Sequence, residues 1–295
     1  MAITAGDIAK LRASTGAGMM DCKKALEEAL GDAEKAMEIL RKKGILKAAK
    51  RADKIAAEGT TLVKTSGNNA VVLEMNSETD FVAKNDSFKK IVEDIADHIL
   101  SVKPASTEEL LTQTLVSGQG TVGENITNIS GTIGEKISLR RFSLLEKTAN
   151  DAFGAYVHMG GKISVLVVLS GVKDEDLARD VAMHVAASNP KYIRREEVPT
   201  EVLEKEKEIY SEQLKQQGKP ANIIENILKG KIDKFYGEVC LLEQPFIKDE
   251  EQKVGRYIES KTPGAKVEKV VRFELGEGME KKSCDFAAEV AEQMK

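Results

Sequence analysis

The chain has 295 residues, of which 41% are hydrophobic and 31% charged, and this length predicts two or three domains that each bury a core. Its net charge is −4 with both signs interspersed, which argues against a protein that mainly grips nucleic acid, because phosphate binding needs a concentrated basic face. No apolar run approaches the ~20 residues that span a membrane, no secretory signal opens the chain, and three distant cysteines suit a reducing cytosol.

Residues 1–54 predict a compact domain of three short helices. The segment 15–18 breaks the first helix, the second begins near Met19 and stops at Gly31, and the third is expected to stop at Gly44. Such a domain has a thin core, and domains of this size are usually docking units. The apolar face expected for the second helix is Met20, Ala25, Leu26 and Ala29.

The segment 42–54 is strongly basic, with alanines between the charges. A solvated helical linker is the favoured interpretation. A nucleic-acid patch is the weaker alternative, because no aromatic side chain is interleaved to stack on bases.

Residues 55–147 predict a first α+β subdomain. Two strands flank a hairpin loop at 65–69, and a helix follows over 87–102. A capping box at 121–124 predicts another helix, and a strand follows over 134–145.

Residues 148–278 repeat this order of elements. Here too, two strands flank a glycine-containing turn, and a helix follows. The helices of both halves carry a histidine, His98 or His184, within the same pattern: Asp, β-branched residue, Ala, any residue, His, β-branched residue. We therefore expect a duplicated α+β subdomain. Equivalent positions favour a structural role for both histidines over a catalytic one.

The connection at 76–86 holds an aromatic residue, Phe81, in an otherwise polar stretch. Its side chain either folds back into the core or enters a pocket of a partner. From Met75 to His98 is 23 positions, but from Leu169 to His184 is only 15, so the first copy has about eight extra residues. Since the fold can turn this corner without them, a partner contact is favoured.

Thr79 is expected to begin a short helical turn in this connection. Its hydroxyl can accept the backbone N–H of Val82, and Asp80 then lies where the N-terminus of a helix favours negative charge.

An insertion at about 198–236 predicts a helical hairpin. Each helix has a narrow apolar stripe, which suits an antiparallel coiled-coil pair and favours an interaction arm over plain core packing. Dimerisation through this hairpin stays open. The chain then predicts a return to the sheet at 239–242, a helix over 251–259 and a strand over 267–275.

Residues 279–295 predict a short amphipathic C-terminal helix that includes Phe286. It is either a packing helix or a separate docking element.

Motifs for covalent chemistry are absent from the sequence. No phosphate-binding loop, dinucleotide fingerprint or nucleophile elbow occurs, and the three histidines have no second ligand at metal spacing. We therefore expect a cytoplasmic binding protein, not an enzyme, with no cofactor, no bound metal, no membrane partner and no direct nucleic-acid partner.

Six separated stretches resemble the elongation factor Ts family, the guanine-nucleotide exchange factors of elongation factor Tu. They run in the family's order and span the chain. The stretches are 12–26, 78–85, 134–137 with Arg140 and Arg141, 182–188 with Pro190, 235–246 and 272–278.

This resemblance implies an α+β protein with an N-terminal ubiquitin-associated-like three-helix domain, two related core subdomains, a coiled-coil hairpin and a C-terminal helix. It implies that the segment of Thr79, Asp80, Phe81 and Val82 enters the partner GTPase near its Mg²⁺ and phosphate site and that His158 also contacts the GTPase. Docking on the GTPase is further implied for Met19, Met20, Lys23 and Phe286. The competing interpretation is an adaptor that binds a GTPase without affecting its nucleotide.

Overall fold

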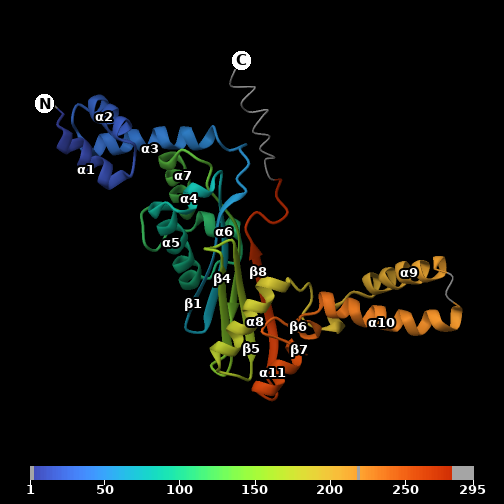
Figure 1. Cartoon of the computed structure of the whole chain (residues 1–295). Coiled ribbons are helices and arrows are strands. Elements are labelled where there is room, and N and C mark those ends of the chain that lie inside the picture. Colours follow the sequence, from blue (N-terminus) through green and yellow to red (C-terminus); the bar gives the residue numbers. More distant parts are fainter. Residues whose placement is uncertain (1–2, 218–219, 281–295) are drawn as a thin grey trace.

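A computed structural model describes residues 3–217 and 220–280, and the fold is of the mixed α+β type (Figure 1). The helices are α1 (Ala5–Thr15), α2 (Met19–Glu28), α3 (Ala33–Ala49), α4 (Asp80–Ala83), α5 (Asp86–Val102), α6 (Thr107–Thr112), α7 (Val122–Ile133), α8 (Glu175–Ser188), α9 (Thr200–Gln216), α10 (Ala221–Val239) and α11 (Val254–Lys261). The strands are β1 (Glu58–Ser66), β2 (Asn69–Ser77), β3 (Ser138–Glu146), β4 (Ala152–His158), β5 (Ile163–Ser170), β6 (Pro245–Phe246), β7 (Asp249–Lys253) and β8 (Lys266–Glu274).

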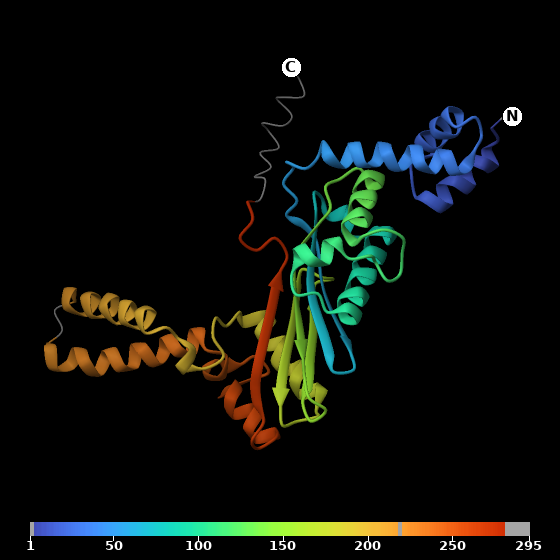
Figure 2. The ribbon, with the colours of Figure 1, turned by 180° about the vertical axis from the view of Figure 1, so that it is seen from behind.

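Two antiparallel three-stranded sheets form the centre of the molecule, with strand orders β1-β2-β3 and β4-β5-β8 (Figure 2). They pack against each other through Val72 and Leu145 of the first sheet and Phe153, Leu166 and Val168 of the second. Helices cover the outer face of each sheet, so both central strands are buried on two sides. This explains why β2 and β5 are continuous apolar runs and do not alternate with polar residues.

The two halves repeat one local arrangement around a buried histidine. In the first half, His98 Nε2 lies 2.9 Å from Gln113 Oε1, and His98 Nδ1 accepts the backbone N–H of Val116. In the second half, His184 makes the same two contacts, with Gln244 and with the backbone N–H of Ile247. Burial lowers the pKa of His184, which stays neutral and can accept this backbone bond. Both histidines therefore orient a loop.

The first three helices form a separate small core around Leu11, Cys22 and Leu26. A capping box between Thr4 and Asp7 begins α1, and the Asp32 side chain caps α3, so local signals set these helix starts. The expectation that Met20 belongs to the apolar inner face is wrong, because its side chain is 61% exposed; Cys22 takes the inner position.

The third helix does not stop at Gly44, as expected, but continues to Ala49. The reason is a tertiary contact. A side chain on Gly131 of α7 would come within 2.3 Å of the Gly44 carbonyl oxygen, so the two glycines allow α3 to cross α7 closely. The basic segment 42–54 is helical up to Ala49 and mostly exposed, as expected for a solvated helical linker, but its end is fixed, because the Arg51 guanidinium bonds the Glu78 carboxylate at 2.9 Å.

The helical hairpin of α9 and α10 projects from the second half of the molecule (Figures 1 and 2). The predicted strand at 239–242 is wrong: Cys240 makes one bridge to Tyr192, and 241–243 forms a 3-10 turn. The small β6–β7 hairpin was not predicted, and it delays the following helix to Val254.

An ion-pair network holds the base of this hairpin. The Arg195 guanidinium bonds both oxygens of Glu243 at 2.8 Å and also Asp233, and Lys253 bonds Glu243 at 2.7 Å. The hydrogen bonds from Arg195, opposed by burial and assisted by Lys253, lower the pKa of Glu243 to about 2.

This network predicts a loss of stability in acid. A carboxyl group whose pKa is lower in the folded than in the unfolded state stabilises the fold at pH values above its unfolded pKa. This contribution disappears as the pH falls through the folded pKa. We expect the free energy of unfolding to drop by up to ~3 kcal/mol as pH falls from about 4.5 to about 2. Urea unfolding at several pH values measures this, and Glu243→Gln should flatten the dependence. An unchanged slope in that variant would contradict the assignment.

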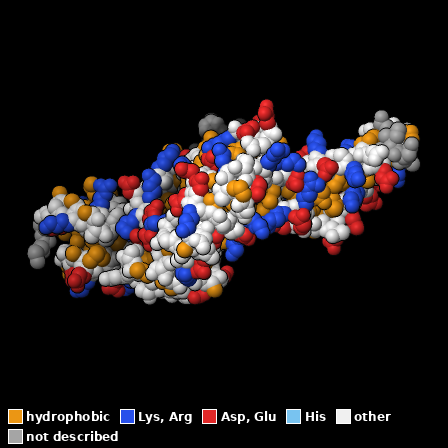
Figure 3. Space-filling model, turned by 90° about the horizontal axis from the view of Figure 1, so that it is seen from below, with side chains coloured by type: hydrophobic (Ala, Val, Ile, Leu, Met, Phe, Trp, Pro, Cys, Tyr) orange, Lys and Arg blue, Asp and Glu red, His pale blue; other side chains and the backbone are white. Residues whose placement is uncertain are grey.

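In the described part of the chain, no helix is both long and apolar enough to cross a membrane. On the face seen from below, Lys and Arg side chains alternate with Asp and Glu side chains over the core and the hairpin (Figure 3).

Candidate functional site

The extra connection of the first half lies between β2 and α5 and contains the single helical turn α4. Phe81 points away from the core and is 75% exposed, whereas the next residue, Val82, is buried in the core under the first sheet. The core alternative for Phe81 is therefore wrong. Lys84 lies over the Phe81 ring, with its Nζ 5.6 Å from the ring centroid, and also 3.6 Å from Asp80.

Thr79 precedes this turn, but its hydroxyl does not cap α4, so the predicted contact with the Val82 N–H is wrong. The hydroxyl instead donates to Glu135 Oε1 at 2.7 Å, and the Thr79 N–H donates to Glu135 Oε2 at 2.9 Å. A carboxylate 56 residues away thus receives the hydrogen bond of this hydroxyl, and a bond to a charged acceptor is stronger than one to a neutral group.

His158 ends β4 at the turn of the second sheet. Its Nδ1 lies 3.1 Å from the Tyr156 hydroxyl, which orients the ring. The next residue, Met159, has a φ of +47° and is 77% exposed, so this turn also presents an apolar tip. Gly161, with a φ of +97°, closes the turn where a side chain would lie 2.0 Å from Thr60 Oγ1.

The start of β1 brings these two tips to the same end of the molecule. Glu58 pairs with Ser77, immediately before the Phe81 connection. Thr61 donates its N–H to the Gly161 carbonyl at 2.7 Å, and Lys162 forms an ion pair with Glu58 at 2.6 Å. The connection of Phe81 and the turn of His158 are therefore fixed to opposite sides of one strand.

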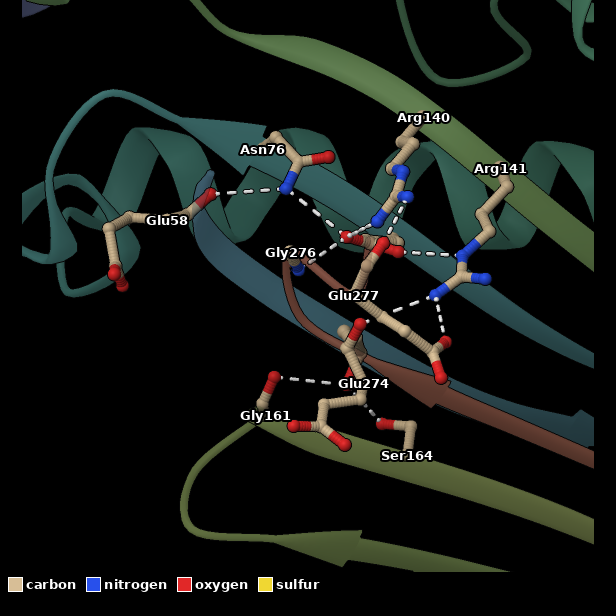
Figure 4. A network of polar contacts seen from close by, with 11 residues as sticks. Glu58, Asn76, Arg140, Arg141, Gly161, Ser164, Glu274, Gly276 and Glu277 are labelled. Carbon is tan, nitrogen blue, oxygen red and sulfur yellow. Dashed lines mark hydrogen bonds and ion pairs between the residues drawn. The ribbon is translucent and has the colours of Figure 1, made fainter. Parts of the chain in front are cut away.

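A buried carboxylate reinforces this end (Figure 4). Glu74 is fully buried and receives bonds from Arg140 at 3.0 Å, from Arg141 at 2.7 Å and from the Gly276 N–H at 2.9 Å. Figure 4 labels these three donors, which converge on the unlabelled carboxylate. A β-bulge places both arginines at the same acceptor, because Glu74 pairs with Arg141 and Met75 pairs with Leu139. We call this group of residues 74, 140, 141 and 276 the Glu74 clamp.

The Glu74 clamp is an electrostatic tie between the two sheets. Burial raises the pKa of Glu74, but the bonds from Gly276 and the two arginines outweigh this and leave the pKa below its ordinary value. Arg140 and Arg141 also bond the backbone carbonyls of Glu277 and Glu274, which follow and end β8.

The other predicted contact residues lie elsewhere. Met19, Met20 and Lys23 are exposed on α2, in the N-terminal helices, and belong to neither the Phe81 connection nor the His158 turn. Phe286 lies outside the described residues. Within the described ranges, no group of three or more His, Cys, Asp or Glu side chains could hold a metal ion.

Reasoning from the sequence missed the functions of Glu135 and Glu74. Both carboxylates fall within predicted strands, Glu74 in the apolar run 70–75 and Glu135 at the start of the strand expected over 134–145. For Glu74, the available signal was a single carboxylate within the apolar run 70–75, since an unpaired buried charge is too costly to occur. Nothing local to Glu135 marks it.

The sequence was compared with models of protein families. The model described as "Elongation factor TS" matches residues 78–277, about two thirds of the chain. The matched region includes the Phe81 connection from residue 78 onward, the His158 turn, and residues 140, 141 and 276 of the Glu74 clamp. Glu74 and the rest of strand β2 precede it.

Proposed function

The chain belongs to the elongation factor Ts family of translation factors, and from this we propose that it binds elongation factor Tu in its GDP-bound form and promotes release of the GDP. The segment of Thr79, Asp80, Phe81 and Val82 would disturb the Mg²⁺ and phosphate site of the GTPase through the exposed Phe81, with Val82 anchoring the turn in the core, and His158 would contact the GTPase alongside. GTP could then load. The proposed exchange activity makes and breaks no covalent bond.

The observation that carries this proposal is the exposed Phe81 on an anchored turn. The Phe81 side chain is large, apolar and 75% exposed. Its neighbour Val82 is buried in the core, and Thr79 is hydrogen-bonded to Glu135, so the ring is preorganised to enter a pocket. Met159, exposed beside His158, is a second apolar tip at the same end of the molecule.

Exchange requires that this protein and GDP weaken each other's binding to the GTPase by the same factor. An acceleration of ~10⁴-fold corresponds to about 5.5 kcal/mol of differential binding. Burial of one Phe side chain supplies roughly 1.5–3 kcal/mol. Phe81 therefore cannot suffice, and the His158 turn and the docking surface of the N-terminal helices must share the work.

The direct test mixes the protein with elongation factor Tu loaded with a fluorescent GDP and follows its release. Acceleration by substoichiometric amounts supports exchange. Binding without acceleration would overturn the proposal in favour of the adaptor function.

The N-terminal helices are proposed to dock on the GTPase through the exposed end of α2. Replacing Met19 and Met20 together by Ala should raise the Kd for elongation factor Tu about tenfold, because two exposed apolar side chains would no longer be buried in the complex. Isothermal titration calorimetry measures this.

Leu30→Ala is the matched control. Leu30 is 86% exposed just beyond the opposite end of α2, so its removal tests whether any exposed apolar residue of these helices has the same effect. An equal loss of affinity in both variants would count against docking through Met19 and Met20. Deletion of residues 1–54 should also weaken binding, but it removes the Arg51–Glu78 contact as well.

A further inference from the structure

The turn after α7 holds the Phe81 connection by a reciprocal pair of contacts. The Glu135 carboxylate accepts the N–H and the hydroxyl of Thr79, as described above. In the opposite direction, the Glu78 carboxylate accepts the Lys136 N–H at 2.6 Å. Two adjacent residues of one segment thus bind two adjacent residues of the other. We call residues 78, 79, 135 and 136 the Glu135 latch.

The Glu135 latch determines the direction in which Phe81 leaves the surface. Thr79 is two residues before Phe81, and Val82, one residue after it, is buried. Both flanking positions are held, and the side chain between them points outward. The turn has no side-chain cap of its own, so Glu135 supplies from outside the restraint that Thr79 would otherwise provide.

Helix α7 also carries the N-terminal helices. Its Gly131 contacts Gly44 of α3 at close range, as described above. At the end of α7, Lys136 Nζ donates to the carbonyl of Ala52 at 2.6 Å, and Arg51 bonds Glu78. One helix therefore supports both the docking helices and the Phe81 turn.

We propose that Glu135 is a positioning residue for nucleotide exchange, which holds Phe81 at a set place relative to the N-terminal docking helices. This inference rests on the proposed function. Docking through α2 would then present the Phe81 ring already oriented, so that little conformational entropy is lost in ordering it on binding.

The chain contains no Trp, so Phe81→Trp introduces a single Trp at the tip of the turn, whose fluorescence is excited selectively over that of the five Tyr residues. In the free protein, its steady-state anisotropy should fall when Glu135→Ala is added, because the turn loses both bonds to Thr79. Glu135→Gln keeps one acceptor oxygen and should give an intermediate value. An anisotropy that is equal in all three proteins would overturn the restraint.

Exchange is measured in the native Phe81 background. Glu135→Ala should reduce the acceleration of GDP release about tenfold, because only part of the free energy of its two hydrogen bonds to Thr79 bears on the orientation of Phe81, and Glu135→Gln should restore part of the acceleration. Circular dichroism and thermal unfolding verify that each variant is folded.

Asp151→Ala is the matched control. Asp151 accepts both the N–H and the hydroxyl of Thr148, the same pair of bonds, at the connection between β3 and β4. It should change neither the anisotropy nor the exchange rate. An equal loss of exchange in this variant would reduce the effect of Glu135 to general stability and overturn the positioning role.

The two levels of inference can fail separately. Native protein that does not accelerate GDP release would overturn the proposed function. Native protein that accelerates release, together with Glu135→Ala that does so equally well, would overturn only the role of Glu135.

Discussion

Phe81→Ala is expected to slow exchange of GDP on elongation factor Tu by roughly ten- to a hundredfold, while the complex still forms. Burial of a Phe side chain contributes roughly 1.5–3 kcal/mol, and each 1.4 kcal/mol is a factor of ten. The loss should appear in the rate of GDP release more than in the affinity for nucleotide-free GTPase, since the ring is proposed to act near the Mg²⁺ site. Stopped-flow release of fluorescent GDP and calorimetric binding measure the two effects.

The variant should fold normally, because the replaced side chain is 75% exposed and contributes little to the core. Val116→Ala is a matched control: Val116 is also a mostly exposed apolar residue of the first half, but it lies after α6 and not in the Phe81 connection. It should leave exchange unchanged. Normal GDP release by Phe81→Ala would refute the proposed action of Phe81 near the Mg²⁺ site, whatever the control shows.

Glu74→Ala is expected to destabilise the fold by about 3 kcal/mol or more. The substitution leaves the partly buried guanidinium groups of Arg140 and Arg141 without their shared carboxylate, and breaking a buried ion pair in this way typically costs 3–5 kcal/mol. The Gly276 N–H, which is buried, also loses its acceptor. Urea unfolding of the whole chain measures the free energy of unfolding.

Exchange activity should decline together with this stability, because the Glu74 clamp ties β8 to the sheet that leads into the Phe81 connection. Glu93→Ala provides the comparison, since it removes a carboxylate from an exposed pair with Lys64, and such pairs contribute about 0–1 kcal/mol. Equal destabilisation by the two substitutions would show that the burial of Glu74 does not increase its contribution to the free energy of unfolding.

The order of helices and strands could be predicted from the sequence because its signals are local. Capping residues marked the starts of α1, α3 and α7, and apolar runs marked β2 and β5. The repeated pattern around His98 and His184 also identified the extra residues of the Phe81 connection by subtraction, before any contact was known.

Long-range contacts explain the predictions that were wrong. Gly44 has the local signature of a helix end, but its missing side chain serves the crossing with α7, and the helix continues. Thr79 has the signature of a cap, but its hydroxyl binds Glu135. In both cases a residue more than 50 positions away decided the outcome.

The sequence by itself determined most of the helices and strands, the repeated pattern around His98 and His184, and the place of Phe81 in a surplus connection, because caps, turns and periodicity act between neighbouring residues. Only the tertiary structure decided that Phe81 and His158 emerge at one end of the molecule and that Glu135 and the Glu74 clamp hold that end in place. Those properties depend on which strands pair, on a bulge that aims two arginines at one carboxylate, and on a close helix crossing, and none of these is encoded in the spacing of residues along the chain.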